Sequence, residues 1–232
     1  MKYLVTLFLG IVAGAALFGL ALIYNPLVND SRLSPLTVTD AEVISLGFSV
    51  VPSESVVYTN NGESTQAPHP PKVSQLWEAP VRHTSGMVAV MNNARGQPAG
   101  IGVKLSSRSE TSRVLNGEAI FVSVWYIYLV EHGGMFIGQS ENYWEFLTEV
   151  AFPAWRSGAN TWRGTWTGDV TAGPGVLGTA YAFGTSGRLR GLEMEAAESL
   201  YVQAFSSDTG FISAEGRLTI ALPEADAEQL AD

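Results

Sequence analysis

The sequence predicts a mostly-β protein: a single antiparallel β-barrel, or a barrel-like sandwich, with one peripheral helix and a transmembrane helix before it. Three observations lead to this fold class. Strand-like runs separated by turn residues recur along the chain, a single stretch shows helical periodicity, and the sequence opens on a long uncharged stretch. A chain of 232 residues can bury one sizeable core, so we expect one folded domain with an appendage.

The opening stretch, from Tyr3 to Tyr24, contains no charged residue. Its length is about what a helix needs to cross a bilayer core of roughly 30 Å. A cleaved signal peptide has a shorter apolar core, typically about 7–15 residues, although Gly19 and Ala21 resemble a cleavage site. We therefore expect residues 1–24 to be a transmembrane anchor or an uncleaved signal. Lys2 before the span favours an inside N-terminus, which in a bacterium gives a single-pass inner-membrane protein with its C-terminal domain in the periplasm.

The rest of the chain divides into a juxtamembrane linker over residues 25–40 and a barrel domain over residues 41–232, with an acidic tail from about residue 223. The proline-rich stretch 66–72 is expected to be a connector, because proline has no backbone donor for a sheet. Strands are expected at 42–51, 86–91, 99–107, 117–130, 134–143, 161–171, 176–184, 190–206 and 211–222. Strands at this spacing are typical of an antiparallel barrel or sandwich.

One helix is expected over residues 142–156. Its apolar stripe, at helical spacing, consists of Tyr143, Phe146, Leu147 and Val150. Pro153 is expected to end or kink it. The run 118–130 is apolar on both faces, and such a strand must be covered on both. We expect the helix to cover the outer face of this run.

Composition and motifs restrict the chemistry. With 22 acidic and 13 basic residues, the chain is not expected to bind nucleic acid. It has no cysteine, which excludes disulfides, thiolate nucleophiles and cysteine-bound metals. The three histidines are His69 in the connector, His83 beyond it and His132 in a predicted turn, so no metal site and no cofactor are predicted. No zinc-protease, phosphate-loop, nucleophile-elbow or dinucleotide motif occurs, which weighs against an enzyme without deciding the question.

The stretch TWRGTWTGDV, residues 161–170, alternates two kinds of side chain. The residues on one face of an extended chain are Trp162, Gly164, Trp166 and Gly168. Glycine beside an indole lets the ring lie flat over the backbone, which favours core packing. A ligand pocket walled by the same tryptophans is the alternative. Trp125, on the run that is apolar on both faces, is also expected inside the barrel.

Several polar residues stand on predicted strands. Gln139, Glu141 and Tyr143 share one face of their strand, and Arg163 shares a face with Asp169. A buried carboxylate with a raised pKa can act as an acid or base, but a solvated outer face gives the same pattern and is the favoured interpretation. A solvated edge is likewise expected for the acidic cluster of Glu193, Glu195 and Glu198. The residues predicted to contact a ligand, if the interior binds one, are Trp125, Gln139, Glu141, Tyr143, Trp162, Arg163 and Trp166.

The stretch GVLGTAYAFGTSGRLRG, residues 175–191, resembles the glycine-rich strand and turn of barrels of the allene oxide cyclase and dirigent type. The residues that carry the resemblance are Gly178, Thr179, Gly184, Ser186, Gly187 and Arg188, followed by the strand AEGRLTIAL at 214–222, and together they cover about a fifth of the chain. The resemblance implies a compact antiparallel barrel with a lipophilic cavity, which in that family guides fatty-acid-derived or phenoxy-radical ligands by shape. The anchor, the helix and the connector depart from that family, so we use the resemblance for the fold only.

Three functions stay open. The first is a non-catalytic envelope protein that binds an apolar small molecule or lipid in its interior, a function motivated by six Trp and eight Tyr. The second is an interaction or assembly subunit of a membrane complex, with a protein partner or a second copy of itself. The third is a cavity-type cyclase or isomerase, which only the resemblance motivates.

Overall fold

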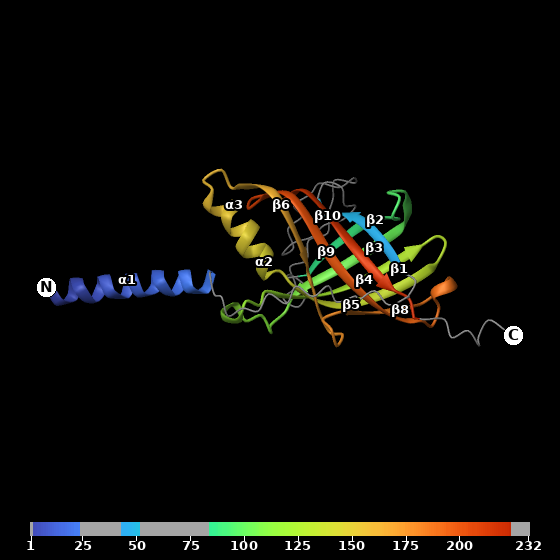
Figure 1. Ribbon diagram of the computed structural model, residues 1–232, viewed down its shortest axis with the longest axis horizontal. Coiled ribbons are helices and arrows are strands. Elements are labelled where there is room, and N and C mark those ends of the chain that lie inside the picture. Colours follow the sequence, from blue (N-terminus) through green and yellow to red (C-terminus); the bar gives the residue numbers. More distant parts are fainter. Residues whose placement is uncertain (1, 24–42, 52–83, 224–232) are drawn as a thin grey trace.

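The computed structural model describes three parts of the chain, residues 2–23, 43–51 and 84–223 (Figure 1). The predictions that fall outside these residues are the linker over 25–40, the connector over 66–72, the acidic tail, and the positions of His69 and His83.

The strands are β1 (Val43–Ser49), β2 (Thr84–Asn92), β3 (Pro98–Arg108), β4 (Ile120–Leu129), β5 (Gly133–Asn142), β6 (Thr161–Asp169), β7 (Thr171–Gly173), β8 (Ala180–Gly184), β9 (Glu193–Ser206) and β10 (Gly210–Ala221). Two short 3-10 helices, η2 (Val114–Asn116) and η4 (Gly187–Leu189), lie in connections. Each predicted strand is present within a few residues. The run predicted as one strand over 161–171 is interrupted at Val170, so that it forms β6 and the start of β7.

Eight of these strands close into an antiparallel barrel. Neighbours pair in the order β10-β1-β2-β3-β4-β5-β8-β9, and β9 pairs back with β10. Different strands lie between β5 and β9 at the two ends of the barrel. At one end β8 pairs with both β5 and β9. At the other end β7 pairs with β5, and β6 pairs with β9. The closed ring confirms the predicted barrel and decides against the sandwich.

The predicted helix forms in three sections, α2 (Trp144–Phe146), the π-helical η3 (Leu147–Ala151) and α3 (Phe152–Arg156). Pro153 does not end it, because the wider π-helical turn precedes the proline and accommodates the missing donor. The helix contacts β6 and β9, and Figure 1 shows it beside β6. The expectation that it covers the outer face of the 118–130 run is therefore wrong, and Tyr128 on that face is 50% exposed.

The interior holds two apolar clusters. The buried residues of the first core cluster are Leu46, Phe48, Ala89, Met91, Trp125, Ile127, Leu129, Met135, Ile137, Ala180, Ala182, Leu189, Met194, Ala196, Leu218 and Ile220. Those of the second core cluster, against the helix, are Phe146, Val150, Trp166, Val170, Leu200, Val202 and Ala214. Close packing in the first depends on Gly102, where any side chain would overlap Met91 and Trp125. Phe48 completes this contact edge-on to Trp125, with 4.9 Å between ring centroids.

The N-terminal stretch forms the helix α1 (Lys2–Ile23). Within the part of the chain that the structure describes, no helix meets both the length and the hydropathy that a membrane crossing requires.

Candidate functional site

One basic and two acidic side chains meet inside the barrel. Strand alternation points Lys104 of β3, Glu141 of β5 and Glu198 of β9 inward, where they are 8%, 0% and 1% exposed. We call these three residues the buried ion cluster. Charged residues are almost never fully buried unless they are paired, so their convergence from three strands is the most unusual feature of the interior.

Lys104 holds the cluster together. Its ammonium donates to both oxygens of Glu198, at 2.7 Å and 3.0 Å, and to Glu141 Oε1. It also lies 5.3 Å from the centre of the Trp125 ring, within the range of a cation–π contact. One cation therefore faces two carboxylates and an indole.

Neutral donors also form hydrogen bonds to the two carboxylates. Trp125 Nε1 donates to Glu198 Oε2 at 2.9 Å, and the Gln139 amide donates to both Glu141 and Glu198. The Thr171 hydroxyl donates to Gln139 Oε1 at 3.1 Å and accepts from the Glu198 backbone N–H at 2.7 Å. Thr171 thereby fixes which side of the Gln139 amide faces the carboxylates.

The two carboxylates have different pKa values. Burial by itself would raise the pKa of Glu198, but Lys104 and the donors Trp125 and Gln139 outweigh it and lower that pKa below the ordinary value. Burial raises the pKa of Glu141 to about 7, because Lys104 offsets it only in part and Glu198 repels a second negative charge. Glu141 Oε2 is buried, and none of the described residues forms a hydrogen bond with it. Glu141 is thus a carboxyl group that changes protonation near neutral pH.

The neighbouring groups keep their ordinary charge at neutral pH. Burial would lower the pKa of Lys104, but the charges of Glu141 and Glu198 outweigh it and raise that pKa, so the ammonium stays charged. Burial and the charge of Glu141 raise the pKa of Tyr143, so the phenol stays neutral. Near neutrality, the site therefore holds one fixed positive charge, one fixed negative charge and one carboxyl that titrates.

A pocket of about 410 Å³ reaches this cluster from the side of the second core cluster. Lys104 and Glu198 form part of its lining. The apolar side chains around it are Val50, Met87, Phe121, Phe146, Leu147, Leu200, Phe205 and Phe211, and its polar lining includes Tyr143, Ser85, Ser106 and the β9–β10 turn from Ser206 to Gly210. The pocket thus has mostly apolar walls and an ion pair at one place.

The structure brings together four of the residues predicted to contact a ligand. Gln139 and Glu141 belong to the polar network, Trp125 donates to it, and Tyr143 lines the pocket. The interpretation of Gln139 and Glu141 as solvated side chains is wrong, because both lie on the inward face of β5 and are buried. Arg163 lies elsewhere, on an exposed position of β6.

The tryptophans of TWRGTWTGDV belong to the core. Trp166 is 7% exposed and packs edge-on against Phe146, with 5.5 Å between ring centroids, while Trp162 is half-buried at the margin of the same cluster. Both indoles lie over glycines as expected: a Cβ at Gly164 would meet Trp162 at 2.8 Å, and one at Gly168 would meet Trp166 at 2.6 Å. A register shift between Arg163 and Trp166 interrupts the regular alternation. Neither tryptophan lines the pocket that reaches the buried ion cluster. Trp166 lines a separate hollow, also of about 410 Å³, together with Glu145, Glu149 and Asp169.

Two residues of the ion cluster were not recognised from the sequence. The expected solvated edge is confirmed for Glu193 and Glu195, which are exposed. It is wrong for Glu198, which lies an odd number of residues from them on β9 and therefore shares the inward face with Leu200. That parity was a usable signal. Lys104 gave a weaker one, because its outward neighbours on β3 are apolar and the usual pattern of polar outside and apolar inside is reversed there.

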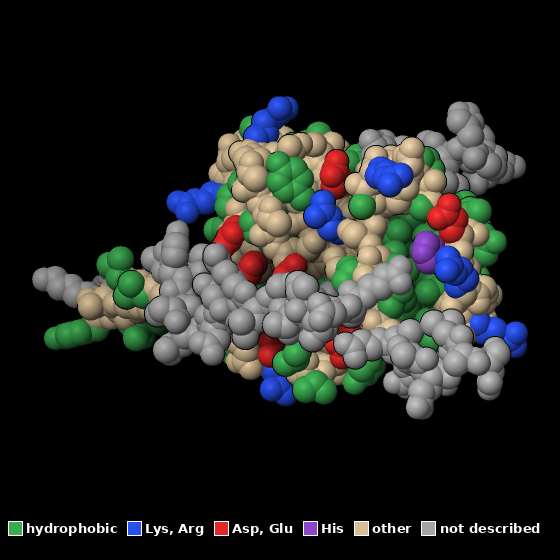
Figure 2. All heavy atoms as spheres, turned by 45° about the vertical axis from the view of Figure 1, so that its right-hand side comes forward, with side chains coloured by type: hydrophobic (Ala, Val, Ile, Leu, Met, Phe, Trp, Pro, Cys, Tyr) green, Lys and Arg blue, Asp and Glu red, His purple; other side chains and the backbone are tan. Residues whose placement is uncertain are grey.

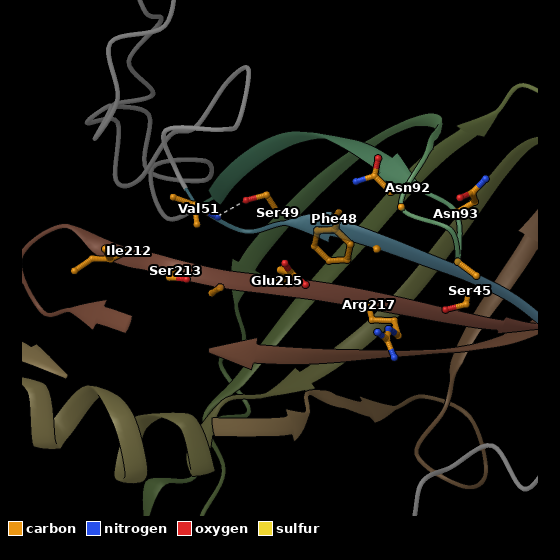
Figure 3. A pocket seen from close by; sticks show the side chains of 14 residues that line it. Ser45, Phe48, Ser49, Val51, Asn92, Asn93, Ile212, Ser213, Glu215 and Arg217 are labelled. Carbon is orange, nitrogen blue, oxygen red and sulfur yellow. Dashed lines mark hydrogen bonds between the residues drawn. The ribbon is translucent and has the colours of Figure 1, made fainter. Parts of the chain in front are cut away.

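Two other hollows are formed by described residues, and neither is lined by a member of the buried ion cluster. A hollow of about 660 Å³ lies over β1 and β10, with Ser45, Glu215 and Arg217 among its lining residues (Figure 3). Its one drawn hydrogen bond is local, from the Val51 backbone N–H to Ser49 Oγ at 3.2 Å. On the face shown in Figure 2, Lys and Arg side chains are scattered singly and form no basic patch.

Comparison with known proteins does not identify a family or an activity for this chain. No protein-family model matches the sequence, and no curated protein is similar to it. Among solved structures, one similar chain is described as a nonspecific heme-binding cyclase that catalyses a [4 + 2] cycloaddition in neoabyssomicin biosynthesis. The two share 8% identity and a TM-score of 0.38, over 83% of this chain and 75% of that one. At these values the likeness carries no argument, and the site has to be interpreted from the chain's own residues.

Proposed function

We propose that the barrel binds a small, mainly apolar molecule that carries one polar group. The observation that supports this is the pocket of about 410 Å³, whose walls are aromatic and aliphatic and whose lining includes the Lys104–Glu198 ion pair. Ligand sites commonly have volumes of about 300–1,000 Å³ and combine apolar walls with a few fixed polar groups. The apolar part of the ligand would contact the Phe146 and Phe211 side of the pocket, and its polar group would reach Lys104 or Glu198.

A pocket-filling substitution tests this proposal. Ser106 lines the pocket, whereas its neighbour Ser107 on the same strand does not. Ser106→Phe should weaken binding of the neutral apolar dye Nile red roughly tenfold or more, which corresponds to a loss of about 1.4 kcal/mol. Ser107→Phe is the matched control and should leave dye affinity unchanged. The proposal is abandoned if both variants, still folded by circular dichroism, bind the dye as the wild type does.

Extraction of the purified protein provides a second test, aimed at the natural ligand. Organic extracts of the purified full-length chain should contain, by mass spectrometry, one compound above background that is depleted in extracts of Ser106→Phe. Equal recovery from both proteins would indicate non-specific lipid carried over during purification.

A cavity-type cyclase or isomerase is the second candidate. Glu141 favours it, because a carboxyl group with a pKa of about 7 can both accept and release a proton. Glu141 does not itself line the pocket, but it accepts a hydrogen bond from Lys104, which does. Under this proposal Glu141→Gln retains Nile red binding but loses turnover of unsaturated or epoxide lipids, monitored by mass spectrometry. Absence of turnover by the wild type across such a panel leaves the binding function alone.

For the location, we propose a single-pass inner-membrane protein with the barrel in the periplasm. The support is the uncharged stretch from Tyr3 to Tyr24 and the position of Lys2 before it. Protease added to spheroplasts should degrade the barrel. Protection of the barrel in intact spheroplasts, with degradation after lysis, would reverse the topology.

A further inference from the structure

The outside of the barrel carries a continuous set of apolar side chains over β3, β4, β5 and β8. Its members, which we call the outer apolar face, are Ile101, Leu105, Val122, Val124, Tyr126, Tyr128, Phe136, Tyr181 and Phe183, and each is between 39% and 55% exposed. The helix α2–α3 packs against β6 and β9 instead. This face is independent of the internal pocket.

The register of the strands determines where large side chains project from the outer apolar face and where it is hollow. Tyr126, Phe136 and Phe183 are cross-strand neighbours in one row, and the first two rings lie 4.9 Å apart. In the adjacent row Gly138 lies between Val124 and Tyr181. A Cβ at Gly138 would meet no atom of the described residues within 4 Å, so this row has an open hollow beside the aromatic ridge.

Among the described residues, neither of these two rows contains a charged side chain between β2 and β8. Towards β2 the ridge row continues with Val103 and Val88, and the hollow row with Leu105 and Gly86. The first charged side chains appear at the margin on β9, where Glu193 pairs with Phe183 and Glu195 pairs with Tyr181. A partner that binds this face therefore needs an uncharged surface of its own.

The extent of the outer apolar face matches a dimer interface. Its nine members are about half exposed, and five are aromatic side chains of the type that cover about 150–250 Å² each when buried. With the four aliphatic members added, the exposed apolar area is on the order of 700–800 Å². Typical monomers expose apolar patches of about 300–600 Å², while a standard interface takes about 800 Å² from each partner.

We propose that the outer apolar face is the contact surface of a homodimer with two-fold symmetry. In such a contact the same patch meets itself, so the Phe136 ridge of one copy can enter the Gly138 hollow of the other. Two uncharged faces also meet without burying an unpaired charge. The net charge of −9 repels the copies at long range, and added salt therefore strengthens the dimer.

Two matched glycine substitutions test the dimer. Gly138 and Gly47 both lie outward on strands, and a Cβ at either meets nothing within 4 Å, so the monomer accommodates Glu at both positions. Gly138 lies in the outer apolar face, whereas Gly47 lies on β1 beside Asn92 and Arg217. Sedimentation velocity of the full-length solubilised chain measures the mass, and thermal unfolding by circular dichroism checks each variant's fold.

The wild type and Gly47→Glu should sediment as dimers of the 24.8 kDa chain, and Gly138→Glu should sediment as a monomer at the same concentration. Raising the salt from 50 to about 500 mM should lower the dissociation constant of the wild-type dimer several-fold. A monomeric wild type overturns the proposal, and so does a dimer that both variants leave intact. Equal loss of the dimer in both variants also overturns it, since the effect is then not specific to this face.

Discussion

The two ends of the barrel interior use the same strands for different purposes. Ile127 and Leu129 of β4 face Met135 and Ile137 of β5 in a dry core, while a few residues away on β5 the inward side chains are Gln139 and Glu141. At the first end apolar burial supplies stability. At the second, charged groups are kept inside at an energetic cost, next to a pocket. Under the proposed function, the apolar end supports the fold and the ionic end contacts the ligand.

The largest effect is expected from breaking the ionic end. Lys104→Met leaves two buried carboxylates without their cation, and removal of one partner from a buried ion pair costs about 3–5 kcal/mol. Chemical denaturation should show this loss at neutral pH. The loss should shrink at acidic pH, where protonation of Glu141 and Glu198 removes the uncompensated charge. A loss that does not depend on pH would mean that Lys104 contributes through packing rather than charge.

A comparable or smaller effect is expected at the apolar end. Ile137→Ala leaves a cavity in the first core cluster and should cost about 2–5 kcal/mol. Nile red affinity measured well below the unfolding transition should stay at the wild-type value, because Ile137 does not line the pocket. A parallel loss of dye affinity would show that the two ends are coupled.

The smallest effect concerns the pH dependence of stability. The pKa of Glu141 is about 7 in the folded protein and 4.5 for the unperturbed side chain. The folded state therefore holds more protons than the unfolded state between these values, and stability falls as the pH rises through this window. The Glu141→Gln variant has no ionisable group at this position, so its stability should not decrease in this way as the pH rises.

The measurement is the difference in Tm between Glu141→Gln and the wild type from pH 5 to pH 8. This difference should grow in favour of the variant by roughly 5–10 °C, since a pKa raised from 4.5 to about 7 is worth about 2–3 kcal/mol over this pH range and 1 kcal/mol shifts Tm by about 2–4 °C for a domain of this size. Glu198, whose pKa is lowered, and Lys104, whose pKa is raised, stay charged across this range. A constant difference would contradict the pKa assigned to Glu141.

Much of the fold was predictable because local pattern carries it. Alternating apolar residues and turn residues indicated the strands, and the stripe through Phe146 and Val150 indicated the helix. The site was predictable only in part. The sequence suggested Gln139 and Glu141 as a pair on one face but did not show that this face was the inner one, and it kept Lys104 and Glu198 apart because they stand on strands far separated in the chain.

By itself, the sequence determined where the strands lie along the chain to within a few residues, the glycines on which Trp162 and Trp166 rest, and the absence of cysteine chemistry, since these follow from near neighbours and composition. Only the tertiary structure decided which face of β5 and β9 points inward, where the helix packs, and that Lys104 meets both carboxylates. The physical reason is that barrel closure sets the inner face and brings β3, β5 and β9 together. This closure depends on pairing between distant strands, which local periodicity does not encode.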